Sequence, residues 1–206
     1  MLAAKPEPRP GPFTWDEYMA WEAEQDEKWE LVDGYAVPRD ERWAFDPAVG
    51  MAGARRFHNL AVANLVRHLG NRLAGGPCAA LPSDMLARVS PSTSRYPDVT
   101  VECGQTDMDG LISEPVVLFE ALSKSNTLRQ QLRLLDDYQA IPTVQQIVFV
   151  ERERPAALSW TRTDESWRRE EYDGLDAVIR LPALQIELPL AEVYERFPFA
   201  AVAQAG

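Results

Sequence analysis

Two acidic residues lie where the sequence predicts strands. Glu120 lies within residues 116–122, a run whose other residues are apolar at both odd and even positions. Such a run predicts a strand that is buried on both faces. Asp98 follows Pro97 at the head of the β-branched stretch 99–101, and a proline is tolerated at a strand start because it need not donate to the ladder there. A lone ionised carboxylate in such a strand is costly unless it is paired, protonated or bound to a metal.

Carboxylates on two neighbouring strands supply the hard oxygen ligands that Mg²⁺ prefers, and they leave coordination positions for water and phosphate oxygens. We therefore predict that Asp98 and Glu120 bind Mg²⁺ or Mn²⁺. The structural alternative is a salt bridge between Glu120 and an arginine from a covering helix.

Two further polar residues fit the same cluster. Glu30 lies among the apolar residues of segment 29–32, and His58 lies in the first turn of a predicted helix. Each also has an ordinary explanation, because most glutamates face solvent and a histidine at a helix start is usually structural or exposed.

The elements that must position these residues follow from periodicity and turn signals. A helix begins at Thr14, which forms a capping box with Glu17, and Asp33-Gly34 predicts the turn of a hairpin. Helices are also predicted at 55–73, at 190–196 and at 127–140, the last with one apolar side made of Leu128, Leu132, Leu135 and Tyr138. Strands are predicted at 78–86, 96–102, 116–122 and 145–151, with a late hairpin at 157–163 and 167–172.

This order predicts one α/β (α+β) domain, in which a central mixed β-sheet is flanked by helices and followed by a C-terminal β-hairpin. The predicted domain covers residues 13–199, between a disordered N-terminal arm at 1–12 and a flexible tail at 200–206.

Charge and composition narrow the classes of function. The formal net charge of −11 argues against a protein that coats nucleic acid through bulk electrostatics, since phosphate contacts come from Lys and Arg. It does not exclude an enzyme that gathers cations locally. No apolar run approaches the roughly 20 residues that span a bilayer. Cys78 and Cys103 show neither metal-ligand spacing nor a disulfide framework, so we expect a cytoplasmic protein with reduced cysteines and no membrane partner.

Several segments follow one another in a specific order: WELVDG, FHNLAVANLVRHL, PCAALPSDM, YPDVTVEC, EPVVLFEALSKSN and DDYQAIPTVQQIVFV. In order and spacing they resemble the Uma-type restriction endonuclease family, a bacterial group within the PD-(D/E)XK superfamily. The resemblance implies a restriction endonuclease-like core and Mg²⁺-dependent hydrolysis of phosphodiester bonds in DNA. It makes Asp98 and Glu120 the metal ligands. Glu30 matches the N-terminal acidic residue of the site, and His58 matches a histidine that positions substrate or a metal-bound water.

One implied catalytic group is missing. The resemblance implies a lysine on the following helix, four residues before a tyrosine, and an aspartate four residues earlier again. Counting back from Tyr138 gives Leu134 and Gln130, which lie on one face of the predicted helix. Lys124 is the better substitute because its flexible stem can reach back into the site, although it can equally be a solvated loop lysine. Arg133 points about a quarter turn away from Leu134.

Three hypotheses therefore remain open. The first is a metal-dependent DNA endonuclease, with a homodimer expected because cutting two strands needs two active sites. The second is a catalytically degenerate nuclease-fold protein that acts as a binding or regulatory module, as Leu134, Gln130 and the acidic net charge favour. The third is a hydrolase with paired carboxylates as acid and base, as in glycosidases, for which the sequence shows no aromatic sugar platform.

Overall fold

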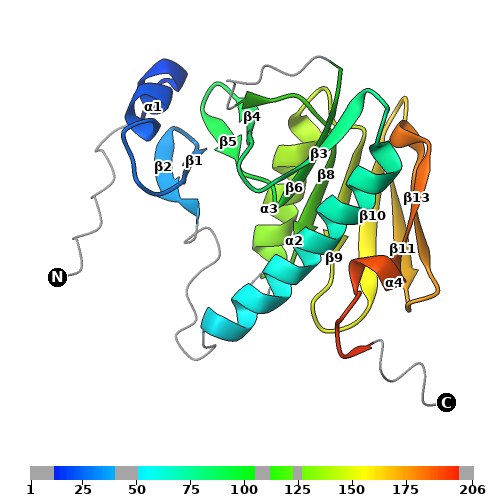
Figure 1. The fold of residues 1–206 in the computed structure, drawn as a ribbon. Coiled ribbons are helices and arrows are strands. Elements are labelled where there is room, and N and C mark those ends of the chain that lie inside the picture. The colour runs from blue at the N-terminus through cyan, green and yellow to red at the C-terminus, as the bar shows by residue number, and fades with distance from the viewer. Residues whose placement is uncertain (1–11, 40–50, 105–111, 123–126, 200–206) are drawn as a thin grey trace.

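A six-stranded mixed sheet forms the centre of the protein (Figure 1). The computed structural model of the chain describes residues 12–39, 51–104, 112–122 and 127–199, with the backbone alone for residues 51–55. The strands of the sheet are β3 (Cys78–Pro82), β6 (Val99–Cys103), β8 (Pro115–Ala121), β9 (Gln146–Val150), β10 (Ala156–Arg162) and β11 (Trp167–Asp173). Their order is β11-β10-β9-β8-β6-β3. Strands β8 and β9 run parallel, and the other neighbouring pairs are antiparallel.

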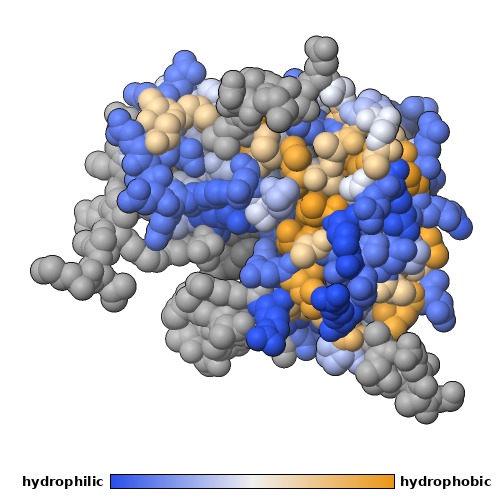
Figure 2. All heavy atoms as spheres, in the orientation of Figure 1, coloured by the Kyte–Doolittle hydropathy of each residue, from blue (hydrophilic) through white to orange (hydrophobic). Residues whose placement is uncertain are grey.

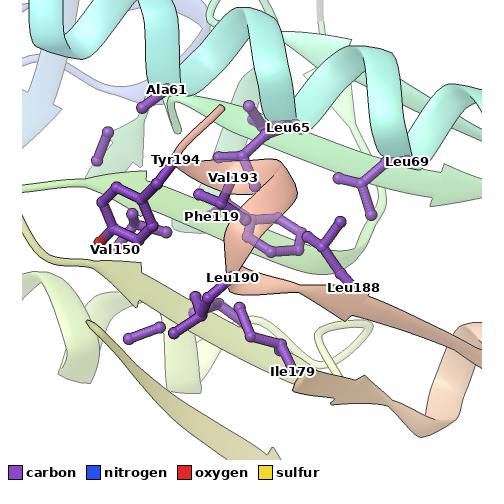
Figure 3. Close-up of a cluster of buried hydrophobic side chains, with 14 of the residues drawn as sticks. Ala61, Leu65, Leu69, Phe119, Val150, Ile179, Leu188, Leu190, Val193 and Tyr194 are labelled. Atoms are coloured by element: carbon purple, nitrogen blue, oxygen red, sulfur yellow. The ribbon is translucent and has the colours of Figure 1, made fainter. Parts of the chain in front are cut away.

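One face of the sheet is covered by the long helix α2 (Met51–Leu73) (Figure 1). The predicted apolar stripe of this helix is buried at Phe57, Ala61, Leu65, Leu69 and Leu73. The C-terminal elements complete this core: β12 (Val178–Leu181), the short helix η2 (Pro182–Leu184), β13 (Ile186–Pro189) and α4 (Leu190–Val193). Figure 3 shows side chains of α2, the sheet and α4 converging there, among them Leu65, Phe119 and Val193.

The opposite face is covered by α3 (Leu128–Ala140), which makes the crossover that the parallel strands β8 and β9 require. Leu134, Leu135 and Tyr138 are buried there, whereas Leu128 is 70% exposed and Leu132 is 50% exposed. The expectation that Leu128 and Leu132 lie on the buried side is therefore wrong. The helix offers two adjoining apolar sides, and the sheet packs against the one that carries Leu134 and Tyr138, one turn apart.

The N-terminal elements form a smaller unit beside the sheet. Helix α1 (Trp15–Glu22) begins with the predicted capping box, and β1 (Trp29–Val32) pairs with β2 (Tyr35–Pro38) as the predicted hairpin. Asp33 and Gly34 have φ angles of 52° and 88°, as a type I′ turn requires at both central residues. This unit shares a core with residues around a short sheet of β4 (Leu86–Ser90), β5 (Thr93–Arg95) and β7 (Ile112–Ser113).

Cys78 and Cys103 form a disulfide that joins β3 to β6. The two residues are cross-strand partners, although 25 positions separate them in the sequence. The expectation of reduced cysteines is therefore wrong, because only the register of β3 against β6 places the two side chains together. The expected cytoplasmic location stays a prediction. Among the described residues, no helix is long and apolar enough to cross a membrane.

The fold class predicted from the sequence is confirmed, since a central mixed sheet carries helices on both faces. The predicted strand at 78–86 is two strands, β3 and β4, and the predicted helix at 55–73 begins earlier, at Met51. The expected arm at 1–12 and tail at 200–206 lie almost entirely outside the described residues.

A substitution of Leu65 by alanine tests the core beneath α2. Leu65 has 0% exposure, so Leu65→Ala should lower the free energy of unfolding by about 2–5 kcal/mol through lost apolar burial and a residual cavity. Leu132→Ala is the matched control, because this leucine is 50% exposed and its loss should change stability by less than about 0.5 kcal/mol. Urea unfolding measures both, and equal losses would contradict the described packing.

Candidate functional site

Asp98 is held by groups from three parts of the chain. The residue is 2% exposed and lies one position before β6. Its Oδ1 accepts a hydrogen bond from Arg39 Nη2 at 3.0 Å, and its Oδ2 accepts one from the backbone N–H of Ala121 at 2.9 Å. His58 Nδ1 lies 3.6 Å from Oδ2. The carboxylate therefore lies where the end of β2, the first part of α2 and the end of β8 meet.

Glu120 lies on β8, the neighbour of the strand that Asp98 precedes. Val99 pairs with Phe119 in the antiparallel register. Asp98, one position before β6, therefore lies beside the part of β8 that carries Glu120 and Ala121, and it accepts the hydrogen bond from the N–H of Ala121. Glu120 is 1% exposed, and its Oε1 accepts a hydrogen bond from the hydroxyl of Tyr138 on α3.

Glu30 belongs to a buried ion-pair cluster with Arg95 and Asp137. Both carboxylate oxygens of Glu30 are bonded, one to Arg95 Nη1 and the other to the backbone N–H of Tyr96, each at 2.9 Å. Arg95 Nε donates to Asp137 on α3 at 2.8 Å. Burial acts to lower the pKa of Arg95, but Glu30 and Asp137 outweigh this and raise that pKa above its ordinary value. The solvent-facing explanation of Glu30 is wrong, since the residue is 0% exposed.

His58 lies at the exposed margin of the site. Its side chain is 32% exposed, and it lines a groove of about 430 Å³ that runs beside α2 past Val62 and Val66 to Ser83. The N–H and hydroxyl of Ser83 donate to the backbone oxygen of Asp98 at 3.0 and 3.1 Å. On the face that carries α2, hydrophilic side chains alternate with hydrophobic ones (Figure 2). Two residues of the groove lining, His58 and Ser83, therefore contact Asp98.

On α3, the two positions at which the family resemblance implies charged residues are occupied by Leu134 and Gln130, which have structural roles. Leu134 is 3% exposed and packs with Leu118. Gln130 closes a capping box, in which its Oε1 accepts a hydrogen bond from the backbone N–H of Thr127 at 2.8 Å. These two residues therefore stabilise the helix and its packing. Lys124, the predicted substitute for the missing lysine, lies outside the described residues.

The donor set tests whether a divalent ion fits. Asp98 and Glu120 offer carboxylate oxygens, and Mg²⁺ is usually held by one or two carboxylates with water and substrate phosphates in the remaining positions. The two residues fit the ion in kind and in number. No group of three His, Cys, Asp or Glu side chains that could hold a metal ion occurs among the described residues. Both carboxylate oxygens of Glu30 are bonded within the protein, to Arg95 and to the backbone N–H of Tyr96.

Sequence reasoning missed Arg39 and Arg95, the two arginines that neutralise acidic residues of the site. Arg39 follows the last residue of β2, and Arg95 ends β5, three positions before Asp98. The available signal was indirect, because a buried carboxylate needs a compensating cation. Which arginine serves which carboxylate depends on how the N-terminal hairpin and the short sheet pack, and the spacing along the chain does not reveal it.

Comparisons with known proteins agree with this fold. A family model described as "Uma2: Putative restriction endonuclease" matches residues 15–191. The chain belongs to the Uma2 family. A curated protein of Synechocystis sp., "Uncharacterized protein slr1290", is 31% identical over 114 residues, and the match covers 53% of each chain, so the Uma2 chain spans about half the length of this relative. A crystal structure titled as a putative nuclease from Anabaena variabilis superposes with a TM-score of 0.65 at 14% identity, covering 89% of this chain and 98% of that one.

The Uma2 match confirms the resemblance predicted from the sequence, and the solved structure confirms the fold. At 14% identity the structural likeness concerns the fold alone. The roles predicted for Asp98, Glu120, Glu30, His58 and Lys124 in this Uma2 protein remain predictions.

Removing Arg95 tests the buried cluster that supports the site. Arg95→Ala leaves Glu30 buried without its cation, so the free energy of unfolding should fall by about 3–5 kcal/mol. The matched control is Arg133→Ala, which breaks an exposed ion pair with Asp33 and should cost less than about 1 kcal/mol. Chemical denaturation of both variants gives the comparison. A loss for Arg95→Ala no larger than that of the control would show that Glu30 is not dependent on this arginine.

Proposed function

We propose that this Uma2 protein is a metal-dependent endonuclease that hydrolyses phosphodiester bonds in DNA. The observation that carries the proposal is a pair of buried acids on or beside neighbouring strands: Glu120 lies on β8, and Asp98 lies one position before β6 and binds the backbone N–H of Ala121, the residue after Glu120. The family match and the likeness of the fold to a structure titled as a nuclease support it. Buried carboxylates cost free energy unless their charge is neutralised, and a bound divalent ion would neutralise both.

Each residue of the site has a role in this proposal. Asp98 and Glu120 would hold Mg²⁺ or Mn²⁺, which supplies charge stabilisation at the scissile phosphate and a bound water of lowered pKa. His58, near Asp98 and part-exposed on the groove, would orient the substrate or the attacking water. Glu30 would act through Arg95, which fixes the segment that leads into Asp98. Lys124, which lies outside the described residues, remains the proposed substitute for the missing lysine.

The setting of the reaction follows from the same proposal. DNA is the proposed substrate, in a bacterial cytoplasm, and a homodimer would supply the two active sites that a double-strand cut requires. Electrostatic attraction at long range would not drive DNA binding, since the net charge is −11 and screening limits such attraction to about 8 Å at physiological salt. Local cations and the metal would make the phosphate contacts.

A second function has a specific observation in its favour. Leu134 is integrated into the core beneath α3, and Gln130 caps the same helix. Both positions therefore serve stability in place of the charged groups that the family pattern implies. A protein that kept the fold and lost cleavage would act as a binding or regulatory module.

Loss of either carboxylate should slow DNA cleavage strongly. Wild-type protein should nick supercoiled plasmid in Mg²⁺ or Mn²⁺, and Asp98→Asn and Glu120→Gln should each slow nicking by on the order of 10²–10³, the range for removal of one group that stabilises charge in the transition state. Asp84→Asn is the control, because this carboxylate is 77% exposed and should leave the rate unchanged. Wild-type protein that fails to nick in either metal would refute the proposal.

Restoring the implied charged pair separates the two functions. The double substitution Leu134→Lys with Gln130→Asp should lower stability, because it buries an ammonium group within the cluster around Leu118 and shortens the side chain of the capping box. If the chain is an active nuclease, the variant should nick plasmid no faster than wild type. Appearance of nicking in the variant, with an inactive wild type, would favour the degenerate module. Circular dichroism confirms that each variant is folded, and Leu134→Met serves as the volume-conserving control.

A further inference from the structure

Arg39 places a positive charge beside Asp98 and has a buried N–H group that is not hydrogen-bonded within the described residues. Its Nη2 contacts Asp98 Oδ1 at 3.0 Å, and its side chain is only 17% exposed. Its Nε is buried and has no hydrogen-bond partner among the residues that the structure describes. A buried donor on a charged group is costly to leave unpaired, so its persistence beside a proposed ligand carboxylate indicates an acceptor that arrives from outside.

Two other arginines within the described part of the chain are bonded to other carboxylates. Arg95 donates through Nε and Nη2 to Asp137 and through Nη1 to Glu30. Arg133 pairs with an aspartate in the β1–β2 turn on the surface. Among the described arginines and lysines, Arg39 is thus the one that forms an ion pair with a proposed metal ligand while keeping a buried donor unused.

The anchoring of Arg39 suits a side chain that changes partner. Its backbone N–H donates to the carbonyl oxygen of Lys28 at 2.9 Å, which fixes the main chain at the end of the β1–β2 hairpin. The long side chain can then exchange one acceptor for another without unfolding the strand pair. A planar guanidinium matches the geometry of a phosphate group, to which it can donate two parallel hydrogen bonds.

We propose that Arg39 is the built-in cation of this site, which neutralises Asp98 before a divalent ion binds and then donates to a phosphate oxygen of DNA. The inference rests on the proposed nuclease function. Arg39 would supply from β2 the positive charge that Leu134 cannot supply from α3. Arg39 holds the carboxylate of Asp98 in the metal-free protein, so an incoming metal ion must compete with it. The arginine therefore weakens metal binding and yet assists cleavage.

This competition gives Arg39 a signature that a structural residue lacks. Removing a residue that merely supports Asp98 would weaken metal binding and cleavage together. Removing a competing cation should strengthen metal binding, because one unit of positive charge disappears from within a few ångströms of the ion. Cleavage should nevertheless slow, because the phosphate loses a charged donor.

The test measures Mn²⁺ affinity and plasmid nicking on the same full-length variants. Mn²⁺ binding is followed by electron paramagnetic resonance of the free ion, without DNA, and nicking is followed at saturating Mn²⁺. For Arg39→Met we expect binding about tenfold tighter than wild type and nicking about 10²-fold slower. Arg39→Lys keeps the positive charge but loses the planar guanidinium that donates two parallel hydrogen bonds. Its Mn²⁺ affinity should stay near that of wild type, while its nicking rate should fall to a value between those of wild type and Arg39→Met.

Arg168→Met is the matched control, because this arginine is 60% exposed on the edge strand β11 and should change neither quantity. Arg39→Met that binds Mn²⁺ no more tightly than wild type would overturn the inference, whatever its rate. A wild type that neither binds Mn²⁺ nor nicks, beside an Arg39→Met variant that binds Mn²⁺, would overturn the nuclease function and support Arg39 as the cation that occupies the site. Absence of Mn²⁺ binding in every variant would overturn both.

Discussion

Neutralisation of buried acid is the constraint on which this structure depends. Glu30, Asp98 and Glu120 are 0%, 2% and 1% exposed, and an uncompensated carboxylate at such depth would destabilise the fold by several kcal/mol. Each is bonded by a donor from another element: an arginine of β5, an arginine after β2, and a tyrosine of α3. The same bonds that offset the charge therefore join the hairpin, the short sheet and α3 to the central sheet.

The N-terminal unit of α1, β1 and β2 contributes to the neutralisation of these buried acids. It buries Glu30 and places Arg39 against Asp98, just before the start of β6, while the short sheet provides Arg95, the partner of Glu30. The central sheet alone would leave Asp98 without the arginine that neutralises it. A site assembled from so many elements is rigid, because moving any one of them exposes or unpairs a charge.

The acids that the family resemblance implies, Asp98 and Glu120, are present, whereas Leu134 and Gln130 occupy the positions of the implied lysine and aspartate. On α3, Leu134 has become part of the core and Gln130 part of a helix cap, so both positions now contribute stability. The cation that contacts Asp98 comes instead from the other side of the site, through Arg39. A positive charge at Arg39, and not at position 134, keeps the local charge balanced but changes the side from which a phosphate would be contacted. The substitution at position 134 therefore bears on whether the protein cleaves DNA.

The sequence by itself determined the elements and the two central acids. Periodicity predicted α2 and α3, the Asp33-Gly34 turn predicted its hairpin, and an acid inside an apolar strand marked Glu120. Only the tertiary structure decided three features that involve residues far apart in the chain: which side of α3 is buried, that Cys78 forms a disulfide with Cys103, and that Arg39 bonds to Asp98. Local patterns follow from backbone geometry within a few residues, whereas these pairings depend on strand register and packing between segments that are far apart in the chain.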